Sequence, residues 1–178
     1  MTTLVVSATR VEAAHLPPDI PLLVTGIGKV PAAAAVARAL AQSPEVDQVI
    51  NIGSCGALRE GLSGVYEAGR VLSHDISAEV IRGLGHDTRE WLTVADTPWL
   101  LATGDQFVHE TTERIRLAEV AHLVDMEGYA VAWACEQAGV PARLVKHVSD
   151  SADETALDWN TAVDRSARDL ADWVSAHL

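Results

Sequence analysis

Four short segments of the chain place acidic or small polar residues directly after an apolar run. They read SATRVE at residues 7–12, NIGSCG at 51–56, DMEG at 125–128 and VSDSAD at 148–153. If the apolar runs are neighbouring parallel strands, these segments meet at one edge of a sheet, where ligands bind. Carboxylates gathered there suit the cleavage of an N-glycosidic bond: one acid protonates the departing base, and another carboxylate handles water or sugar hydroxyls.

The same residues also allow a plainer interpretation. An acidic side chain after a strand often caps the next helix, because it accepts hydrogen bonds from the free N–H groups of the first turn. Taken one at a time, each carboxylate fits that structural role at least as well as a catalytic one. The residue types alone leave both interpretations open.

Apolar runs and helical patterns alternate along the chain and would position these segments. Buried strands are predicted at residues 4–6, 21–24, 49–52, 71–72, 100–102, 123–124 and 144–148. Helices are predicted at residues 29–42, 111–118 and 129–137, and from residue 159 onward. The alternation predicts an α/β fold, a three-layer αβα sandwich with a mostly parallel or mixed central sheet. No repeat or linker divides the chain, so residues 1–178 are expected to form one domain.

Two of these helices have an apolar face with helical spacing. The helix at 29–42 is predicted from the helical spacing of the apolar residues Val30, Ala33, Ala37 and Leu40. The last helix is expected to bury Val163, Ala167, Leu170 and Val174 against the sheet.

The composition argues against a nucleic acid or a membrane as a binding partner. The chain has 178 residues, 48% of them hydrophobic, which is typical of a globular domain with a core. Its 25 acidic residues exceed its 13 basic ones and give a formal net charge of −12, so binding to a nucleic acid is not expected. There is no basic segment followed by a long apolar stretch, and no apolar run approaches the roughly 20 residues of a membrane span. We therefore expect a cytoplasmic protein with no membrane partner.

Metal and thiol chemistry have weak support. The pairs His74-Asp75 and His86-Asp87 invite a metal-phosphohydrolase interpretation, but the seven histidines are scattered without ligand spacing. Cys55 and Cys135 lie in apolar surroundings and form no metal-binding pattern. We therefore expect no metal and no cofactor.

Taken together, the strand-end segments carry a family resemblance. Six stretches occur in the order that the family has: 7–12, 25–30 (TGIGKV), 51–56, 103–108 (TGDQFV), 124–127 and 148–153. The chain resembles the nucleoside phosphorylase/nucleosidase superfamily, and is most similar to its 5′-methylthioadenosine/S-adenosylhomocysteine nucleosidase and futalosine hydrolase branch. The resemblance implies hydrolysis of the N-glycosidic bond of a purine nucleoside, without a cofactor, by a homodimer.

The resemblance implies a role for three carboxylates. Asp150 matches the acid that gives a proton to N7 of the purine, with Ser149 helping to fix its carboxylate. Glu127 matches the ribose-binding carboxylate, and Met126 would offer the sugar an apolar surface, although an ordinary core methionine fits Met126 equally well. Glu12 matches the residue that orients and activates the attacking water.

Further residues match the lining of the substrate pocket. Phe107 would stack on the purine, with Val108 beside it, although a core phenylalanine remains an alternative. The small residues Ser54, Cys55 and Gly56 match a loop along sugar and base, where a ligand approaches the backbone closely. Ala8 belongs to the same lining through its place in the first motif.

The chain also departs from its relatives. It is shorter, chiefly between residues 75 and 103, the region that shapes the 5′ end of the pocket in the family. Lys146 stands where an arginine is common, which replaces a forked donor with a point charge. Two other functions stay open: a phosphate-dependent purine nucleoside phosphorylase, for which Arg10 could hold the anion, and a nucleoside-binding protein without catalysis.

Overall fold

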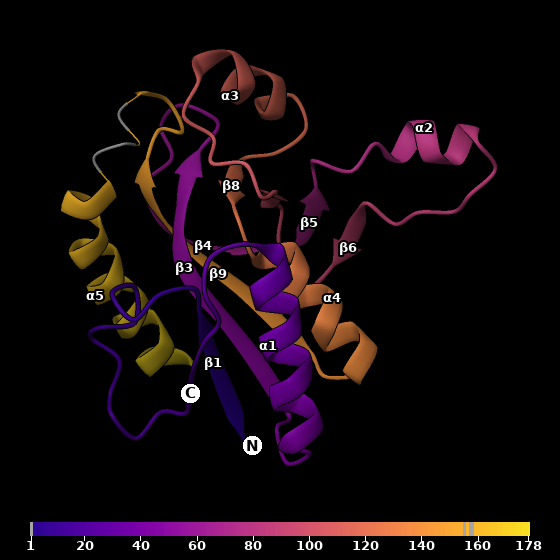
Figure 1. The fold of residues 1–178 in the computed structure, drawn as a ribbon. Coiled ribbons are helices and arrows are strands. Elements are labelled where there is room, and N and C mark those ends of the chain that lie inside the picture. The colour runs from indigo at the N-terminus through magenta and orange to yellow at the C-terminus, as the bar shows by residue number, and fades with distance from the viewer. Residues whose placement is uncertain (1, 155, 157–158) are drawn as a thin grey trace.

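A single mixed sheet forms the centre of the molecule (Figure 1). The computed structural model describes residues 2–154, 156 and 159–178, and only the backbone of residues 159–161. The strands within this part of the chain are β1 (Thr3–Ser7), β2 (Leu22–Val24), β3 (Gln48–Ala57), β4 (Gly64–Ala68), β5 (Arg70–Ser73), β6 (Trp91–Thr93), β7 (Leu100–Thr103), β8 (Leu123–Asp125) and β9 (Ala142–Asp150).

The long strand β3 organises this sheet. It pairs in parallel with β1 on one side and with β9 on the other. At its far end Gly56 and Ala57 pair antiparallel with β8, which continues in parallel to β7 and β5. The edge strands β4 and β6 are antiparallel to their neighbours. The carboxyl ends of β1, β8 and β9 therefore converge around the second half of β3.

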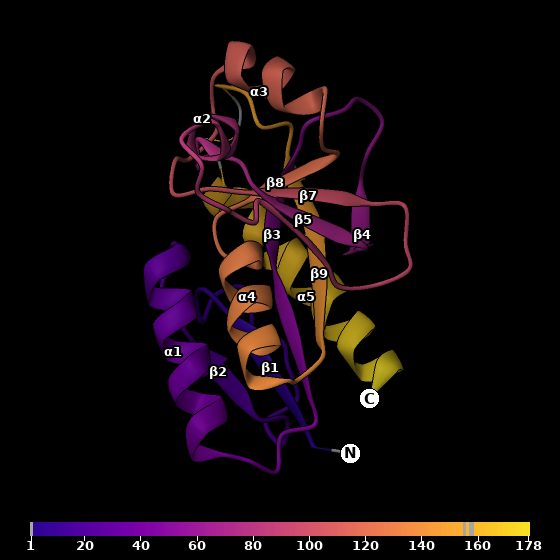
Figure 2. The ribbon, with the colours of Figure 1, turned by 90° about the vertical axis from the view of Figure 1, so that its right-hand side faces the viewer.

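Helices cover both faces of this sheet. They are α1 (Lys29–Gln42), α2 (Ala78–Gly83), α3 (Thr111–Ala118), α4 (Gly128–Ala138) and α5 (Trp159–His177). The helices α1 and α4 lie together on one face and α5 lies on the other, as two views at right angles agree (Figures 1 and 2). The predicted three-layer α/β fold with a mixed central sheet is confirmed.

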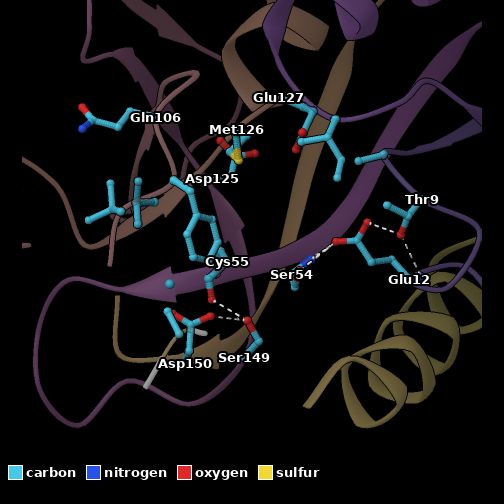
Figure 3. Close-up of a pocket in the computed structure, with 17 residues that line it drawn as sticks. Thr9, Glu12, Ser54, Cys55, Gln106, Asp125, Met126, Glu127, Ser149 and Asp150 are labelled. Carbon is cyan, nitrogen blue, oxygen red and sulfur yellow. Dashed lines mark hydrogen bonds between the residues drawn. The ribbon is translucent and has the colours of Figure 1, made fainter. Parts of the chain in front are cut away.

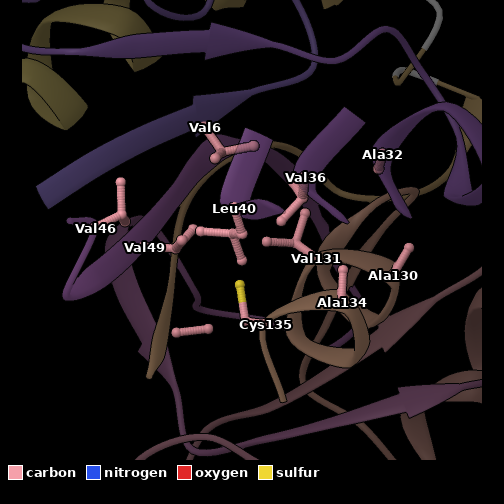
Figure 4. Packing of buried hydrophobic residues seen from close by; sticks show 11 residues of the cluster. Val6, Ala32, Val36, Leu40, Val46, Val49, Ala130, Val131, Ala134 and Cys135 are labelled. Carbon is pink, nitrogen blue, oxygen red and sulfur yellow. The ribbon is translucent and has the colours of Figure 1, made fainter. Parts of the chain in front are cut away.

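Close packing between α1, α4 and the first half of β3 fills one side of the core (Figure 4). The helix α1 buries Ala32, Ala35, Val36 and Leu40. The helix predicted at 29–42 is confirmed, but the residues whose spacing predicted it are not all on the buried face: Leu40 is buried, whereas Val30 is 75% exposed. An alanine-rich helix presents apolar residues on every side, so spacing alone does not select the buried one.

The helix α5 packs as its spacing predicted. Val163, Ala167, Leu170 and Val174 are all buried against β9, β3 and β4. A polar contact adds to this packing: Asp169 Oδ2 lies 2.9 Å from His147 Nε2, and Ser166 Oγ lies 2.9 Å from His147 Nδ1. Ser166 and His147 are buried, so these contacts attach α5 to β9.

Three elements were not predicted from the sequence: β4, β6 and α2. A fourth difference concerns residues 53–56, which were expected to form a loop after the strand at 49–52. The strand β3 runs through all of them and ends at Ala57, because β9 supplies hydrogen-bonding partners along its length. The segment between β5 and β6, which contains α2, extends away from the sheet (Figure 1). No helix in the described part of the chain is both long and apolar enough to cross a membrane.

Candidate active site

A cavity of about 290 Å³ opens where β3, β8, β9 and the turn after β1 meet (Figure 3). The residues predicted from the sequence for a site all line this cavity: Ala8, Glu12, Ser54, Cys55, Gly56, Phe107, Val108, Met126, Glu127, Ser149 and Asp150. The fold thus brings together segments that are up to about 140 positions apart in the chain. Their individual roles stay predictions.

Glu12 is held from two sides. Its Oε1 accepts hydrogen bonds from the Ser54 N–H at 2.9 Å and from the Ser54 hydroxyl at 2.8 Å. Its Oε2 accepts one from the Thr9 hydroxyl at 2.8 Å. Thr9 Oγ1 in turn lies 3.3 Å from the Glu12 N–H, so the turn after β1 is closed on itself. A carboxylate with this many donors has a fixed orientation.

Asp150 ends β9 beside the second half of β3. Its Oδ2 lies 2.6 Å from Ser149 Oγ, and its Oδ1 accepts a hydrogen bond from the Ala152 N–H at 2.8 Å. The Ser149 hydroxyl also lies 3.3 Å from the Cys55 carbonyl oxygen. Ala152 is fully buried with φ of +52°, a backbone conformation that is costly for a residue with a side chain. Strained backbone next to a cavity carboxylate is typical of a functional loop.

Close approach of backbone segments requires glycine at position 56. A Cβ there would lie 2.7 Å from the Ala152 Cβ and 3.1 Å from Asp150 Oδ1. Gly56 therefore lets the loop that carries Asp150 pack directly on β3.

Glu127 reaches the cavity from the N-terminal end of α4. Its Oε1 accepts a hydrogen bond from the Gly28 N–H at 2.8 Å, at the start of α1. Burial raises the pKa of Glu127 to about 7, and the nearby Asp125 and Glu12 add to this effect. Lys146 and the Gly28 N–H act in the opposite direction. A carboxyl group whose pKa lies near neutrality is a frequent feature of functional sites.

Apolar side chains complete the lining. Phe107 is 43% exposed, so the alternative of a core phenylalanine is wrong, and its ring lies parallel to that of His109 at 6.2 Å. Val108 is buried, and Met126 is half-buried against the cavity. Burial raises the pKa of the Cys55 thiol well above its ordinary value, so this residue is a protonated part of the wall.

Some lining residues were missed by sequence reasoning: Thr9, Ile27, Gln106, Val124, Asp125 and Ala156. Thr9 and Asp125 stand inside the recognised motifs, and their polar types next to Glu12 and Glu127 were the available signal. Asp125 also bears out the plainer interpretation of strand-end acids, because its Oδ2 accepts a hydrogen bond from the Gly128 N–H at 2.8 Å. Arg10, in contrast, is exposed and does not line the cavity.

Comparison with known proteins finds a match to one protein family. The model of the phosphorylase superfamily matches residues 18–71 and 98–178. The 5′-methylthioadenosine/S-adenosylhomocysteine nucleosidase of Haemophilus influenzae is 30% identical over 179 aligned positions, covering 86% of this chain and 77% of that protein. The aminodeoxyfutalosine nucleosidase of Helicobacter pylori is 35% identical over 80 residues, covering 43% of this chain and 35% of that protein.

A solved structure shows the same fold. It is that of the Helicobacter pylori 5′-methylthioadenosine/S-adenosyl homocysteine nucleosidase, with a TM-score of 0.85 and 20% sequence identity. The superposition covers 98% of this chain and 96% of that one. The family model leaves residues 72–97 unmatched, and these contain α2, which extends away from the sheet, and the edge strand β6. The chain therefore departs from the family within the region that sequence reasoning had singled out.

Proposed function

Because the chain belongs to the phosphorylase superfamily, we propose that it is a nucleosidase, which hydrolyses the N-glycosidic bond of a purine nucleoside and releases free base and free sugar. One observation carries the proposal: Glu12, Glu127 and Asp150, from three separate segments, line one cavity together with the half-exposed Phe107. The site has a carboxyl group for each task that the reaction poses. The named activities of its relatives agree with this assignment.

Asp150 is proposed as the general acid. Protonated Asp150 gives its proton to N7 of the purine while the bond between the base and the sugar carbon breaks, and the electron pair of that bond leaves with the base. The Ser149 hydroxyl lies within reach of both Asp150 Oδ2 and the Cys55 carbonyl oxygen. It can therefore donate to Cys55 when Asp150 carries the proton, and to Asp150 once the proton has left.

Glu127 is proposed to hold the ribose. An ionised carboxylate accepts hydrogen bonds from both sugar hydroxyls, and its negative charge favours the cationic sugar that develops as the base departs. The hydrogen bond from the Gly28 N–H leaves Oε2 and further lone pairs of Oε1 for this purpose. Met126 would present its thioether to the other side of the sugar.

Glu12 is proposed to take the proton from the attacking water. The oxygen of the water bonds to the sugar carbon, its proton goes to Glu12, and the product is the free sugar. The Ser54 and Thr9 donors fix the direction in which Glu12 can accept this proton. A fixed orientation of the base raises the rate of the chemical step, because water and carboxylate already stand in the geometry that proton transfer requires.

Water is favoured over phosphate by the charges around the cavity. Among the described residues that line it there is no Lys or Arg, whereas Glu12, Asp125, Glu127 and Asp150 are all acidic. A phosphate ion in this cavity would meet several carboxylates, and no cation among these lining residues could bind it directly. A phosphorylase is therefore the weaker candidate.

We also propose that the protein forms a homodimer. Ile27 and Phe107 line the cavity yet are 58% and 43% exposed, and Val30 nearby on α1 is 75% exposed. A second copy placed over them would bury apolar surface and close the mouth of the cavity. Light scattering of the wild type and of Val30→Glu tests this proposal. A wild-type monomer would contradict it.

The function is tested by base release from methylthioadenosine, S-adenosylhomocysteine, adenosine, inosine and futalosine, followed by chromatography with and without phosphate. We expect release without phosphate, with the free sugar as second product. Release that requires phosphate and yields a sugar phosphate would establish a phosphorylase instead. Measurable binding without any release would favour a nucleoside-binding protein.

A further inference from the structure

Lys146 on β9 places a cation in the interior of the molecule, with a side chain that is 1% exposed. Its ammonium lies 2.8 Å from Asn51 Oδ1 and 2.9 Å from Asp125 Oδ2. An ammonium group is removed from water at a large cost, which only close partners of opposite charge offset. The position of Lys146 directly behind the cavity therefore calls for an explanation.

Acidic side chains surround this ammonium. Lys146 Nζ and Glu12 Oε1 both lie beside Gly53 of β3, at 3.4 and 3.3 Å from where a Cβ on that glycine would stand, and the two charges interact. Asp125 is in direct contact with Nζ, and Glu127 also interacts with this charge. One ammonium thus faces the carboxyl groups of Glu12, Asp125 and Glu127.

Asp125 connects this charge to the backbone that carries Glu127. The oxygen that contacts Lys146, Oδ2, also accepts the Gly128 N–H at 2.8 Å, and Oδ1 accepts the Thr103 hydroxyl at 2.5 Å. Thr103 Oγ1 in turn accepts the Tyr129 N–H at 3.0 Å. Both carboxylate oxygens of Asp125 therefore hold the first turn of α4, Oδ2 directly and Oδ1 through Thr103. Glu127 is the residue immediately before that turn.

We propose that Lys146 is a positioning residue: it fixes Asp125, and through it the start of α4, and its charge favours the anionic form of Glu127 inside a largely buried cluster of carboxyl groups. The inference deepens the proposed function, because it rests on that function for the role of Glu127 with the sugar. Lys146 itself does not line the cavity.

The pKa shifts agree with this geometry. Burial by itself would lower the pKa of Lys146, but Asp125, Glu127 and Glu12 reverse this, so the pKa of the ammonium lies above its ordinary value. The charged or polar groups that face Glu127 in the described chain are Asp125 on β8, Lys146 on β9, Glu12 after β1 and the Gly28 N–H. Lys146 is the cation in this set, and it lowers the pKa of Glu127.

The test is a ¹³C NMR titration of glutamate carboxyl groups in the protein without substrate, with Glu127→Gln to assign the resonance. In Lys146→Met we expect the pKa of Glu127 to rise by at least about one pH unit, since an opposite charge at close range is lost. Lys146→Arg, which keeps the charge, should titrate close to the wild type. Arg38→Met removes an exposed charge on α1 and should leave the titration of Glu127 unchanged.

Asp125→Asn gives an independent result of opposite sign. It keeps an oxygen for the Gly128 N–H but removes a negative charge, so the pKa of Glu127 should fall. If Lys146→Met does not fold, the same titration of Lys146→Gln decides. Unchanged titration of Glu127 in Asp125→Asn, or equal titration in Lys146→Met and the wild type, overturns the proposal.

Activity is the second readout. In Lys146→Met, kcat/KM at pH 7 should fall at least about tenfold and recover in part at higher pH, where Glu127 ionises again. If no nucleoside is cleaved by the wild type while the titrations shift as expected, the proposed function fails and the charge relationship stands. If the wild type is active and the titrations do not move, the inference about Lys146 fails alone.

Discussion

Glu12 receives two hydrogen bonds on one oxygen from a single residue, Ser54, whose N–H and hydroxyl lie 2.9 and 2.8 Å from Oε1. The N–H belongs to the backbone of β3, so the orientation of Glu12 is tied to the most central strand of the sheet. The hydroxyl can be removed without disturbing that strand. A substitution at the Ser54 side chain can therefore change the orientation of the Glu12 carboxylate while the fold stays intact.

Ser54→Ala should lower kcat by about 10- to 100-fold, because Glu12 loses one of its charge-assisted hydrogen bonds and with it a fixed orientation toward water. KM should change little, since Glu12 is not proposed to hold the sugar. Steady-state kinetics check this, with Ser63→Ala at an exposed position as the matched control. Equal kcat in Ser54→Ala and the wild type would show that the Ser54 hydroxyl is not needed to orient Glu12.

Asp150→Asn should reduce turnover by about 10²- to 10⁴-fold, the range of a lost general acid, because an amide has no proton of suitable acidity for N7. The fold should persist, since the amide can still accept the hydrogen bond from the Ala152 N–H. Activity and thermal unfolding are measured together, with Asp19→Asn on the surface as control. Substantial activity in folded Asp150→Asn would exclude this residue as the acid.

The site residues could be predicted from the sequence because small and acidic residues follow apolar runs in motifs of fixed order. Glu12, Glu127 and Asp150 each lie within two residues of such a run or inside a recognised segment, and all of them line one cavity. The contact between Lys146 and Asp125 could not be predicted in the same way. It depends on how β8 and β9 are placed on the two sides of β3, which no local pattern encodes.

The errors in the predicted fold have a similar origin. Two glycines and a serine in NIGSCG favour a turn, yet pairing with β9 and β8 keeps this stretch in β3. Tertiary pairing overrides local propensity there. The short strands β4 and β6 lie at the edges of the sheet, where a brief apolar run is not distinguishable from a loop.

Gly56→Ala should damage the site more than the fold. The added methyl group would lie 2.7 Å from the Ala152 Cβ and must push away the loop that carries Asp150. We expect kcat/KM to fall by more than about 100-fold, with a loss of roughly 1–3 kcal/mol in the free energy of unfolding. Gly83→Ala is the control, because a Cβ there meets no atom within 4 Å. A fully active Gly56→Ala would show that this loop can move without consequence.

Glu127→Ala should lower kcat/KM for ribonucleosides far more than for their 2′-deoxy analogues. The carboxylate is proposed to accept hydrogen bonds from sugar hydroxyls, and an analogue without one of them has less to lose. We expect kcat/KM for the ribonucleoside to fall at least about tenfold further than that for the deoxy compound. Competition between the two substrates in one assay measures this difference directly. Equal losses on both would contradict a ribose-binding role.

Glu127 should also make the stability of the protein depend on pH. Its pKa is about 7 in the fold and 4.5 in its ordinary state, so the folded protein binds the proton more tightly than the unfolded chain does. The contribution of Glu127 to stability is therefore complete below pH 4.5 and is lost as the pH rises toward 7. Glu127→Gln keeps an acceptor for the Gly28 N–H but has no proton to lose.

Urea unfolding at pH 5 and at pH 8.5 tests this linkage. Relative to the wild type, Glu127→Gln should gain about 2 kcal/mol in the free energy of unfolding at pH 8.5 over its value at pH 5. Glu45→Gln, at an exposed position of the loop before β3, should show no such difference between the two pH values. The same gain for Glu127→Gln at both pH values would mean that Glu127 titrates in the folded protein near its ordinary pKa. A positive result would show that this carboxylate is kept for its chemistry at a cost to stability.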